Sequence, residues 1–138
     1  PTRSTAARCG SSNRWAYRAV VCGWECPSNA PINGSEAPEL TSHETVCILN
    51  AGDTDAEVTI TIFYTDREPG GPYRLKVAAR RTQHVRFNNL DDPEPIPKNT
   101  DFASMIESSV PIVVQHTRLD SRQAETALLS TVAYAAGD

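Results

Sequence analysis

Two segments of the sequence carry polar side chains at alternate positions, a spacing that gathers side chains on one face of a β-strand. In Arg80–Phe87, one alternating set contains His84 and the other contains Arg81. In Val110–Asp120, one alternating set begins with apolar residues and ends in three polar side chains, those of His116, Arg118 and Asp120. A face of that composition is suited to the floor of a pocket with a polar mouth.

A third group of reactive side chains stands where His43 and Glu44 are adjacent. Neighbouring residues of a strand point to opposite faces, so only one of the two can face a shared site. Histidine titrates near neutral pH, and arginine donates paired hydrogen bonds to anionic groups. We therefore expect a site for an anionic or hydroxylated ligand, formed by Glu44, Arg81, His84, Gln115, His116, Arg118 and Asp120.

A structural interpretation of the same residues has similar weight. Arg118 and Asp120 would form an ion pair at a strand end, and the histidines would tie loops together or line a subunit interface. Zinc is a weaker alternative, because the three histidines are scattered along the chain rather than held at ligand spacing. Cys22 and Cys26 lack a second cysteine pair, so we predict neither a metal nor a cofactor.

No catalytic signature stands out in the chain. The sequence lacks a nucleophile elbow, a phosphate loop and a dinucleotide fingerprint. Spacing alone assigns no acid–base pair. We therefore predict that the protein is not an enzyme.

Composition and charge place the chain among ordinary globular proteins. It has 138 residues, the size of one domain, and its 13 basic and 17 acidic residues leave a net charge of −4. That charge gives no overall attraction to nucleic acid, although a local basic stripe runs through Arg74, Lys76, Arg80, Arg81 and Arg86. DNA binding by this stripe is the alternative function, weakly supported because aromatic stacking partners are sparse.

The remaining residues predict the elements that position these groups. No apolar run approaches the roughly 20 residues of a membrane-spanning helix, and the polar N-terminus lacks a secretory signal, so we expect a soluble, cytoplasmic protein with reduced cysteines. Residues 1–13 are predicted to be a disordered tail, and residues 14–136 one domain. Period-two patterns and turn residues predict strands at Trp15–Trp24, Thr45–Asn50, Val58–Tyr64, Tyr73–Val77, Arg81–Phe87, Phe102–Glu107, Pro111–Leu119 and Thr126–Ala133.

About eight short antiparallel strands with frequent turns are typical of a single all-β, jelly-roll-like β-sandwich with little helix. In Val58–Tyr64 we expect Val58, Ile60 and Ile62 to face the core and the two threonines, Thr59 and Thr61, to face outward. The segments Phe102–Glu107 and Pro111–Leu119 are predicted to form a hairpin. Ser121–Leu129 could contain one helical turn.

Several longer strings resemble one protein family, that of the sensory rhodopsin transducers, over roughly Ser42 to Tyr134. They are His43–Asp53, Gly71–Arg74, Ala79–Thr82, His84–Asn88, Asp101–Ser104 and Val113–Glu125. Near the N-terminus, Ala19–Pro27 keeps the glycine, aromatic residue and proline of the family's first strand but lacks its acidic residue.

The resemblance implies a β-sandwich that assembles as a homotetramer. In the cyanobacterial namesake the transducer receives a signal from a membrane-embedded retinal photoreceptor, and an action on gene expression through DNA is also attributed to it. More widely, the family resembles a module for small, sugar-like ligands. We therefore expect a non-enzymatic signalling or small-molecule-binding module, with a DNA-binding transcriptional regulator as the alternative.

Overall fold

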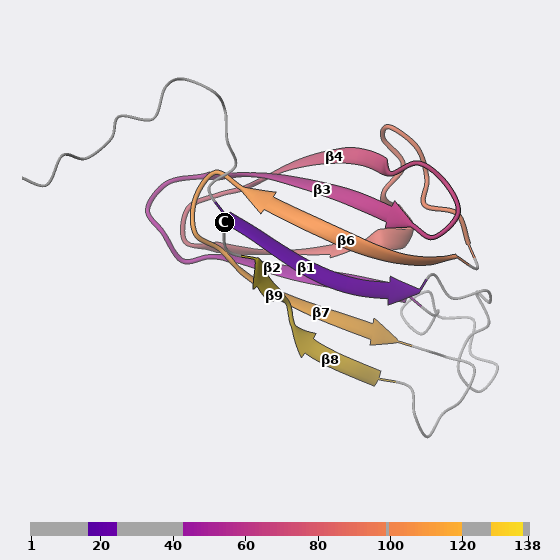
Figure 1. The fold of residues 1–138 in the computed structure, drawn as a ribbon. Helices are drawn as coiled ribbons and strands as arrows, with labels where there is room; N and C mark the ends of the chain where they lie inside the picture. Colours follow the sequence, from indigo (N-terminus) through magenta and orange to yellow (C-terminus); the bar gives the residue numbers. More distant parts are fainter. Residues whose placement is uncertain (1–16, 25–42, 99, 120–127, 137–138) are drawn as a thin grey trace, which may run out of the picture.

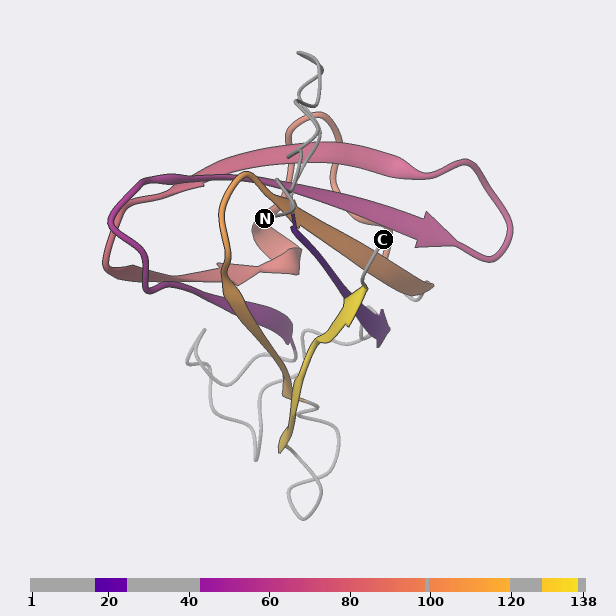
Figure 2. The same ribbon diagram turned by 60° about the vertical axis from the view of Figure 1, so that its left-hand side comes forward.

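The protein folds into two antiparallel β-sheets packed face to face, as Figures 1 and 2 show. The structure, a computed structural model, describes residues 17–24, 43–98, 100–119 and 128–136. The strands are β1 (Tyr17–Trp24), β2 (His43–Asn50), β3 (Ala56–Tyr64), β4 (Gly70–Val77), β5 (Arg81–Arg86), β6 (Asp101–Ser108), β7 (Val113–Leu119), β8 (Leu128–Val132) and β9 (Tyr134–Ala136).

The predicted β-sandwich is confirmed. One sheet has the strand order β4-β3-β6-β1-β9 and the other has the order β5-β2-β7-β8. Each of the eight predicted strands has a counterpart in β1 to β8, and β9 is additional. Within the described residues the only helix is the three-residue 3₁₀ helix η3 (Phe87–Asn89), so none there could cross a membrane.

The hairpin predicted from β6 and β7 is wrong. β6 pairs with β1 and β3 in one sheet, whereas β7 pairs with β2 and β8 in the other. Residues 109–112 connect the two sheets. Four extended residues span roughly 13 Å, enough to cross the ~10 Å between packed sheets. The crossing lets Ile106 of β6 and Val114 of β7 join one core from opposite layers.

The core is centred on β3, where Val58, Ile60 and Ile62 are buried as predicted. Thr59 lies on the outer side of the sheet, as predicted, but its side chain is buried there. It lies in register between Arg74 of β4 and Glu107 of β6. An interior strand has neighbours on both sides, so a short side chain there is enclosed by longer ones. Sequence alternation identifies the two faces but not the burial of the outer one.

Other predictions have mixed outcomes. Phe87, expected at a strand end, instead begins η3 and is fully buried in the core. Cys47 carries a free thiol, as predicted for that cysteine.

The predicted tail and most of the helical turn at 121–129 lie outside the described residues. Leu128 and Leu129, which would end that turn, belong to strand β8.

A buried asparagine ties together the turns at one end of the sandwich. The amide nitrogen of Asn50 donates to the carbonyl oxygens of Thr54 and Val77, at 2.8 and 3.1 Å. Its side-chain oxygen accepts a hydrogen bond from the backbone N–H of Gly52 at 3.1 Å. One side chain at the end of β2 therefore fixes both the β2–β3 turn and the end of β4.

Replacing Asn50 with alanine should lower the free energy of unfolding by about 2–3 kcal/mol, because buried backbone groups lose their partners. Thr54→Ala is the matched control. Thr54 is exposed and contributes only its backbone carbonyl, so its loss should change stability by less than about 0.5 kcal/mol. Urea unfolding measures both values. Equal effects of the two substitutions would contradict this role of Asn50.

Tyr73 of β4 is buried, and its hydroxyl donates to the carbonyl oxygen of Glu94 at 2.8 Å. Burial is the main cause that raises the pKa of Tyr73 to about 12, with smaller contributions from Tyr64 and Glu94. The folded-state pKa lies above the unfolded value of about 10. The resulting stabilisation is therefore fully present below pH 10 and is lost as the pH rises toward 12.

The ionisation of Tyr73 can be followed by phenolate absorbance near 295 nm. The difference between the wild type and Tyr73→Phe should titrate with a midpoint near pH 12 while the protein remains folded. The same substitution should flatten the decline in unfolding free energy between pH 10 and 12. A midpoint near pH 10 would show that Tyr73 ionises as freely as an exposed tyrosine.

Candidate functional site

A buried acid–base pair links β2 to β7 inside the sandwich. Nε2 of His116 lies 2.7 Å from Oε2 of Glu44, and the two side chains are 5% and 1% exposed. The carboxylate accepts this hydrogen bond and the imidazole N–H donates it. The ring of Phe87 packs against the imidazole at a centroid distance of 6.5 Å. The pair is thus enclosed between two strands and an aromatic ring.

The alternation of β2 explains how Glu44 reaches the interior. Its even-numbered residues, from Glu44 to Asn50, are all buried, and its odd-numbered residues face the other side. In the register of β2 with β7, Glu44 is opposite Arg118 and Val46 is opposite His116. Glu44, His116 and Arg118 therefore share the inner face of this sheet, as predicted for the two β7 residues.

The geometry of this inner cluster favours holding strands together over contact with a substrate. A catalytic acid–base pair must come within hydrogen-bond reach of a reacting group. Both side chains are shielded from solvent, and neither lines a described pocket. Burying charged or polar groups is costly unless they are paired, and here each group supplies the other's partner.

Two other predicted site residues, His84 and Gln115, lie on the opposite, outer face of the same sheet. Cys47 of β2 separates them, since it pairs with His84 on one side and Gln115 on the other. The thiol of Cys47 lies 3.5 Å from Nε2 of His84 and 3.3 Å from the hydroxyl of Thr82. The row therefore carries an imidazole, a thiol and an amide across three strands.

The outer row continues onto β8 through hydroxyl groups. Gln115 donates from its side-chain amide to the hydroxyl of Ser130 at 2.7 Å. That hydroxyl also lies 3.1 Å from the hydroxyl of Thr117 and donates to the backbone carbonyl of His116 at 3.3 Å. The outer face of the β5-β2-β7-β8 sheet thus presents adjacent donors and acceptors.

Arg81, another of the predicted site residues, joins neither of these two groups. Arg81 is exposed at the start of β5, opposite Asn50, and its guanidinium donates to the carbonyl oxygen of Arg80 at 2.9 Å. Asp120 lies outside the described residues. The strands Arg81–Arg86 and Val113–Leu119 are not neighbours, because β2 lies between them. The six predicted site residues that the structure describes are therefore divided among two faces and one end of the sheet.

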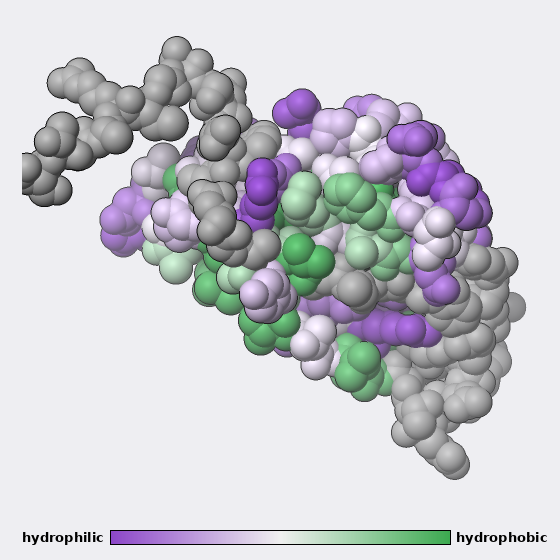
Figure 3. All heavy atoms as spheres, viewed as in Figure 1, coloured by the Kyte–Doolittle hydropathy of each residue, from purple (hydrophilic) through white to green (hydrophobic). Residues whose placement is uncertain are grey.

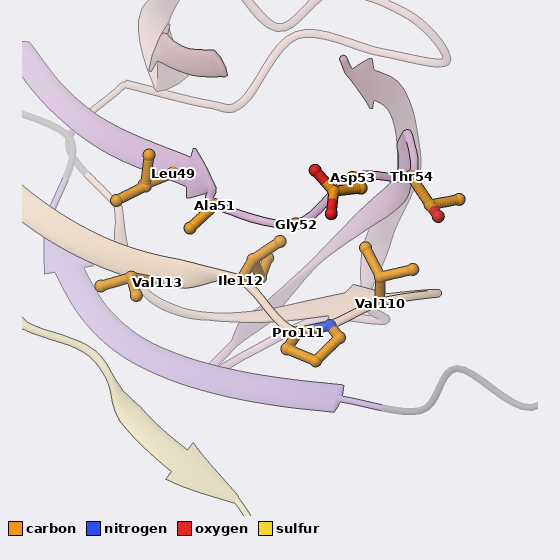
Figure 4. A pocket seen from close by; sticks show the side chains of 9 residues that line it. All are labelled: Leu49, Ala51, Gly52, Asp53, Thr54, Val110, Pro111, Ile112 and Val113. Atoms are coloured by element: carbon orange, nitrogen blue, oxygen red, sulfur yellow. The ribbon is translucent and has the colours of Figure 1, made fainter. Parts of the chain in front are cut away.

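The structure also contains a pocket that sequence reasoning missed. A mostly apolar hollow of about 330 Å³ lies where the β2–β3 and β6–β7 connections meet, as Figure 4 shows. It is lined by Leu49, Ala51, Gly52, Asp53, Thr54, Val110, Pro111, Ile112 and Val113. One feature of the sequence points to this pocket: the apolar residues Leu49 and Val113 stand at outward positions of their strands. Both side chains are exposed in the structure.

A second hollow, of about 480 Å³, lies between the start of β4 and the segment after η3. Its wall on β4 includes Arg74, and its other wall includes Asp91 and Asp92. Among the residues that the structure describes, none of the predicted site residues lines either hollow.

The basic stripe is partly neutralised by neighbouring acids. Nζ of Lys76 lies 2.9 Å from a carboxylate oxygen of Asp55, and Arg80 forms an ion pair with Asp53. A hydrogen bond from Lys76, followed by one from the backbone of Ala79, lowers the pKa of Asp55. Two of the five cations therefore have acidic partners, which weakens the stripe as a phosphate-binding surface.

The Glu44–His116 pair can be tested by a double-mutant cycle. Glu44→Leu or His116→Leu alone should cost about 3–5 kcal/mol of unfolding free energy, because each removes the hydrogen bond between two buried polar groups. The double variant should cost less than the sum by at least about 1 kcal/mol.

Thr45 and Thr117 provide the control, since they face each other on the outer side of the same two strands. Because accessible cross-strand threonine pairs interact by roughly 0.2–1 kcal/mol, alanine substitutions there should deviate from additivity by less than those of the buried pair. Denaturant unfolding measures both cycles. Additive losses at Glu44 and His116 would mean that the hydrogen bond does not couple the strands.

Comparison with known proteins identifies the family of this chain. Residues 22–135 match the family described as the Anabaena sensory rhodopsin transducer. A solved structure of the Anabaena sensory rhodopsin transducer is 61% identical, with a TM-score of 0.61; the match covers 72% of this chain and 94% of that one.

A second solved structure, of Thermotoga maritima protein 1070, is 30% identical, with a TM-score of 0.70; the match covers 86% of this chain and 93% of that one. A comparison with curated proteins finds no match to this chain. The two-sheet fold and the long sequence match lead to one conclusion: this chain belongs to the Anabaena sensory rhodopsin transducer family.

Proposed function

We propose that this chain is a non-enzymatic binding module that relays a signal. The observation that carries the proposal is the outer face of the β5-β2-β7-β8 sheet, where His84, Cys47 and Gln115 form one row of accessible polar groups. The name of its 61%-identical relative, a sensory rhodopsin transducer, indicates the kind of signal. We propose a retinal photoreceptor of the membrane as the partner and the cytoplasm as the place of contact.

The chemistry of this row also suits a small hydroxylated ligand, such as a sugar. Amide, imidazole and hydroxyl side chains both donate and accept hydrogen bonds, which is what a sugar's hydroxyl groups require. Of the seven predicted residues, we assign direct contact to His84 and Gln115, with Arg81 at the edge. Asp120, which lies outside the described residues, remains part of the proposed site.

The buried residues Glu44, His116 and Arg118 receive a different role in this proposal. β2 carries Glu44 on its inner face and Cys47 on its outer face. A shift of this strand would therefore change the surroundings of both side chains at once. Packed elements tend to have discrete arrangements rather than deform continuously. A partner bound to the outer row would therefore be coupled to the buried pair through β2.

Two further proposals concern the organisation of the protein. We propose that residues 14–136 act as one domain behind a tail at residues 1–13, and that the protein works as a homotetramer. Exposed apolar side chains on the β5-β2-β7-β8 sheet support self-association, since large exposed apolar groups often mark interfaces. DNA binding has less support, because Lys76 and Arg80 are paired with acidic residues.

Isothermal titration calorimetry tests the outer row. The chain is titrated with a sensory rhodopsin in lipid nanodiscs and, separately, with D-glucose and other hexoses. His84→Ala/Gln115→Ala should raise the Kd of the partner that binds at least tenfold, which corresponds to about 1.4 kcal/mol. Thr61→Ala, on the outer face of the other sheet, should leave the Kd unchanged.

An equal loss of affinity in His84→Ala/Gln115→Ala and in Thr61→Ala would contradict the proposal that the partner binds to the outer row. Absence of binding to rhodopsin and to hexoses would contradict the proposed function itself. Binding to duplex DNA that weakens steeply with added salt would favour the alternative regulator.

A further inference from the structure

A thiol and an imidazole face each other across two neighbouring strands on the outer side of the β5-β2-β7-β8 sheet. Cys47 of β2 is directly opposite His84 of β5, and its Sγ lies 3.5 Å from Nε2 of His84. Directly opposite residues of an antiparallel pair hold their Cβ atoms about 4.5–5.5 Å apart. The backbone of the two strands therefore brings both donor atoms to one point.

The hydroxyl of Thr82 adds an oxygen atom beside this point. It lies 3.3 Å from Sγ of Cys47, and it donates its own proton to the backbone carbonyl of Ile48 at 3.3 Å. Because that proton is directed to Ile48, the lone pairs of the hydroxyl oxygen remain for the side of Cys47. The thiol of Cys47 is free and partly exposed, and the side chain of His84 is exposed. An ion can therefore reach the pair from solvent.

The donor atoms of the pair suit a thiophilic cation rather than a hard one. Thiolate sulfur and imidazole nitrogen bind soft or borderline metal ions, whereas Ca²⁺ and Mg²⁺ take oxygen ligands. Structural zinc sites need four protein ligands. Among the residues that the structure describes, no third histidine, cysteine or acidic side chain joins the pair. The pair therefore fits a soft ion of low coordination number, which Cu(I) is.

The charge next to the pair favours a monovalent ion. Arg86 follows His84 by two residues on β5, and both lie on the outer face, opposite Thr45 and Cys47. A thiolate and Cu(I) together carry no net charge, so the neighbouring guanidinium costs this complex little. A thiolate with a divalent ion keeps a positive charge, which Arg86 repels.

Apolar side chains border the pair along β2 and β7. Leu49, the next outward residue of β2 after Cys47, is 41% exposed, and Val113, opposite Leu49 on β7, is 54% exposed. Figure 3 shows that hydrophobic residues also gather along the lower rim of the molecule, where β8 lies. Such surroundings offer little to a strongly hydrated hard cation. Within the described residues, Sγ of Cys47 and Nε2 of His84 are therefore the strongest metal donors on this face.

We propose that Cys47 and His84 form a binding site for Cu(I). The ion replaces the thiol proton, which passes to solvent, and forms one bond to Sγ of Cys47 and one to Nε2 of His84. The other ring nitrogen, Nδ1, then carries the imidazole proton. Copper stays in the Cu(I) state throughout, so the step needs no oxidant or reductant.

The observed separation of the two donor atoms allows one ion to bind both. Bonds to thiolate sulfur and imidazole nitrogen are about 2.3 and 2.0 Å long for zinc, a d¹⁰ ion like Cu(I). Their sum exceeds the 3.5 Å between Sγ of Cys47 and Nε2 of His84. The ion therefore bridges the two atoms with a bent geometry, and the strands need not move apart.

The Cu(I) site goes beyond the proposed function, because the chain binds the ion without a partner. The two proposals share His84 but differ at Gln115, which lies on the far side of Cys47 in the outer row. Gln115 contributes to the proposed partner site and not to the Cu(I) site. Gln115→Ala is therefore the matched control.

Anaerobic titration with Cu(I), in competition with the chelator bicinchoninate, measures the affinity. The background is Cys9→Ser/Cys22→Ser/Cys26→Ser, which leaves Cys47 as the only thiol. This chain should bind one equivalent of Cu(I). His84→Ala should raise the Kd at least tenfold, Cys47→Ser should abolish binding, and Gln115→Ala should leave the Kd unchanged.

An unchanged Kd in His84→Ala would overturn the two-ligand site, because Cys47 would then act as an isolated thiol. Tighter binding of Zn²⁺ than of Cu(I) would overturn the assignment of the ion. Intact Cu(I) binding in a chain that binds neither rhodopsin nor hexoses would support the Cu(I) site and overturn the proposed function alone.

Alkylation of the wild type tests the site with all four cysteines in place. The chain is treated with iodoacetamide, and mass spectrometry follows the modification of Cys47. Cu(I) should slow this modification at least tenfold in the wild type and in Gln115→Ala, but less than threefold in His84→Ala. Equal protection in the wild type and His84→Ala would contradict a bond from His84 to the ion.

Discussion

The rest of the structure depends on the strict alternation of β2 between two surroundings. This strand lies between β5 and β7, with its inward residues in the core and its outward residues on the accessible face. Because successive side chains of a strand point to opposite faces, each side chain of β2 lies either in the core or on the accessible face. The buried pair, the outer row and the turns held by Asn50 all begin from this one strand.

The buried Glu44–His116 pair fixes the register in which β2 pairs with β7. A slip of one residue would expose Glu44 and bring the hydroxyl of Thr45 into the interior, leaving His116 without its acceptor. The cost of an unpaired buried polar group therefore opposes every register but the observed one. The pair sets the strand register, whereas the overall stability of the sandwich comes from apolar residues such as Ile48, Ile60 and Ile106.

The two sheets differ in how fully their outer faces are closed. In the β4-β3-β6-β1-β9 sheet, Thr59 and Glu107 are buried on the outer side, and Arg18 forms a 2.9 Å salt bridge with Glu107. The outer side of the β5-β2-β7-β8 sheet remains accessible and mixes polar with apolar groups. Both the proposed partner site and the proposed Cu(I) site therefore fall on the same sheet.

Sequence alone determined the strands and their faces, because a period of two is a local property that neighbouring residues reveal. It identified the core residues Val58, Ile60 and Ile62 and placed His116 and Arg118 on one face. It could not pair the strands: the sequence pattern predicts a hairpin of β6 and β7, whereas these strands lie in different sheets.

Only the tertiary structure brought Glu44 to His116, which is 72 residues away, and placed His84 on the face opposite to both. It alone brought the thiol of Cys47 to the imidazole of His84. Strand pairing and burial depend on which distant segments exclude water from one another, and no local pattern carries that information.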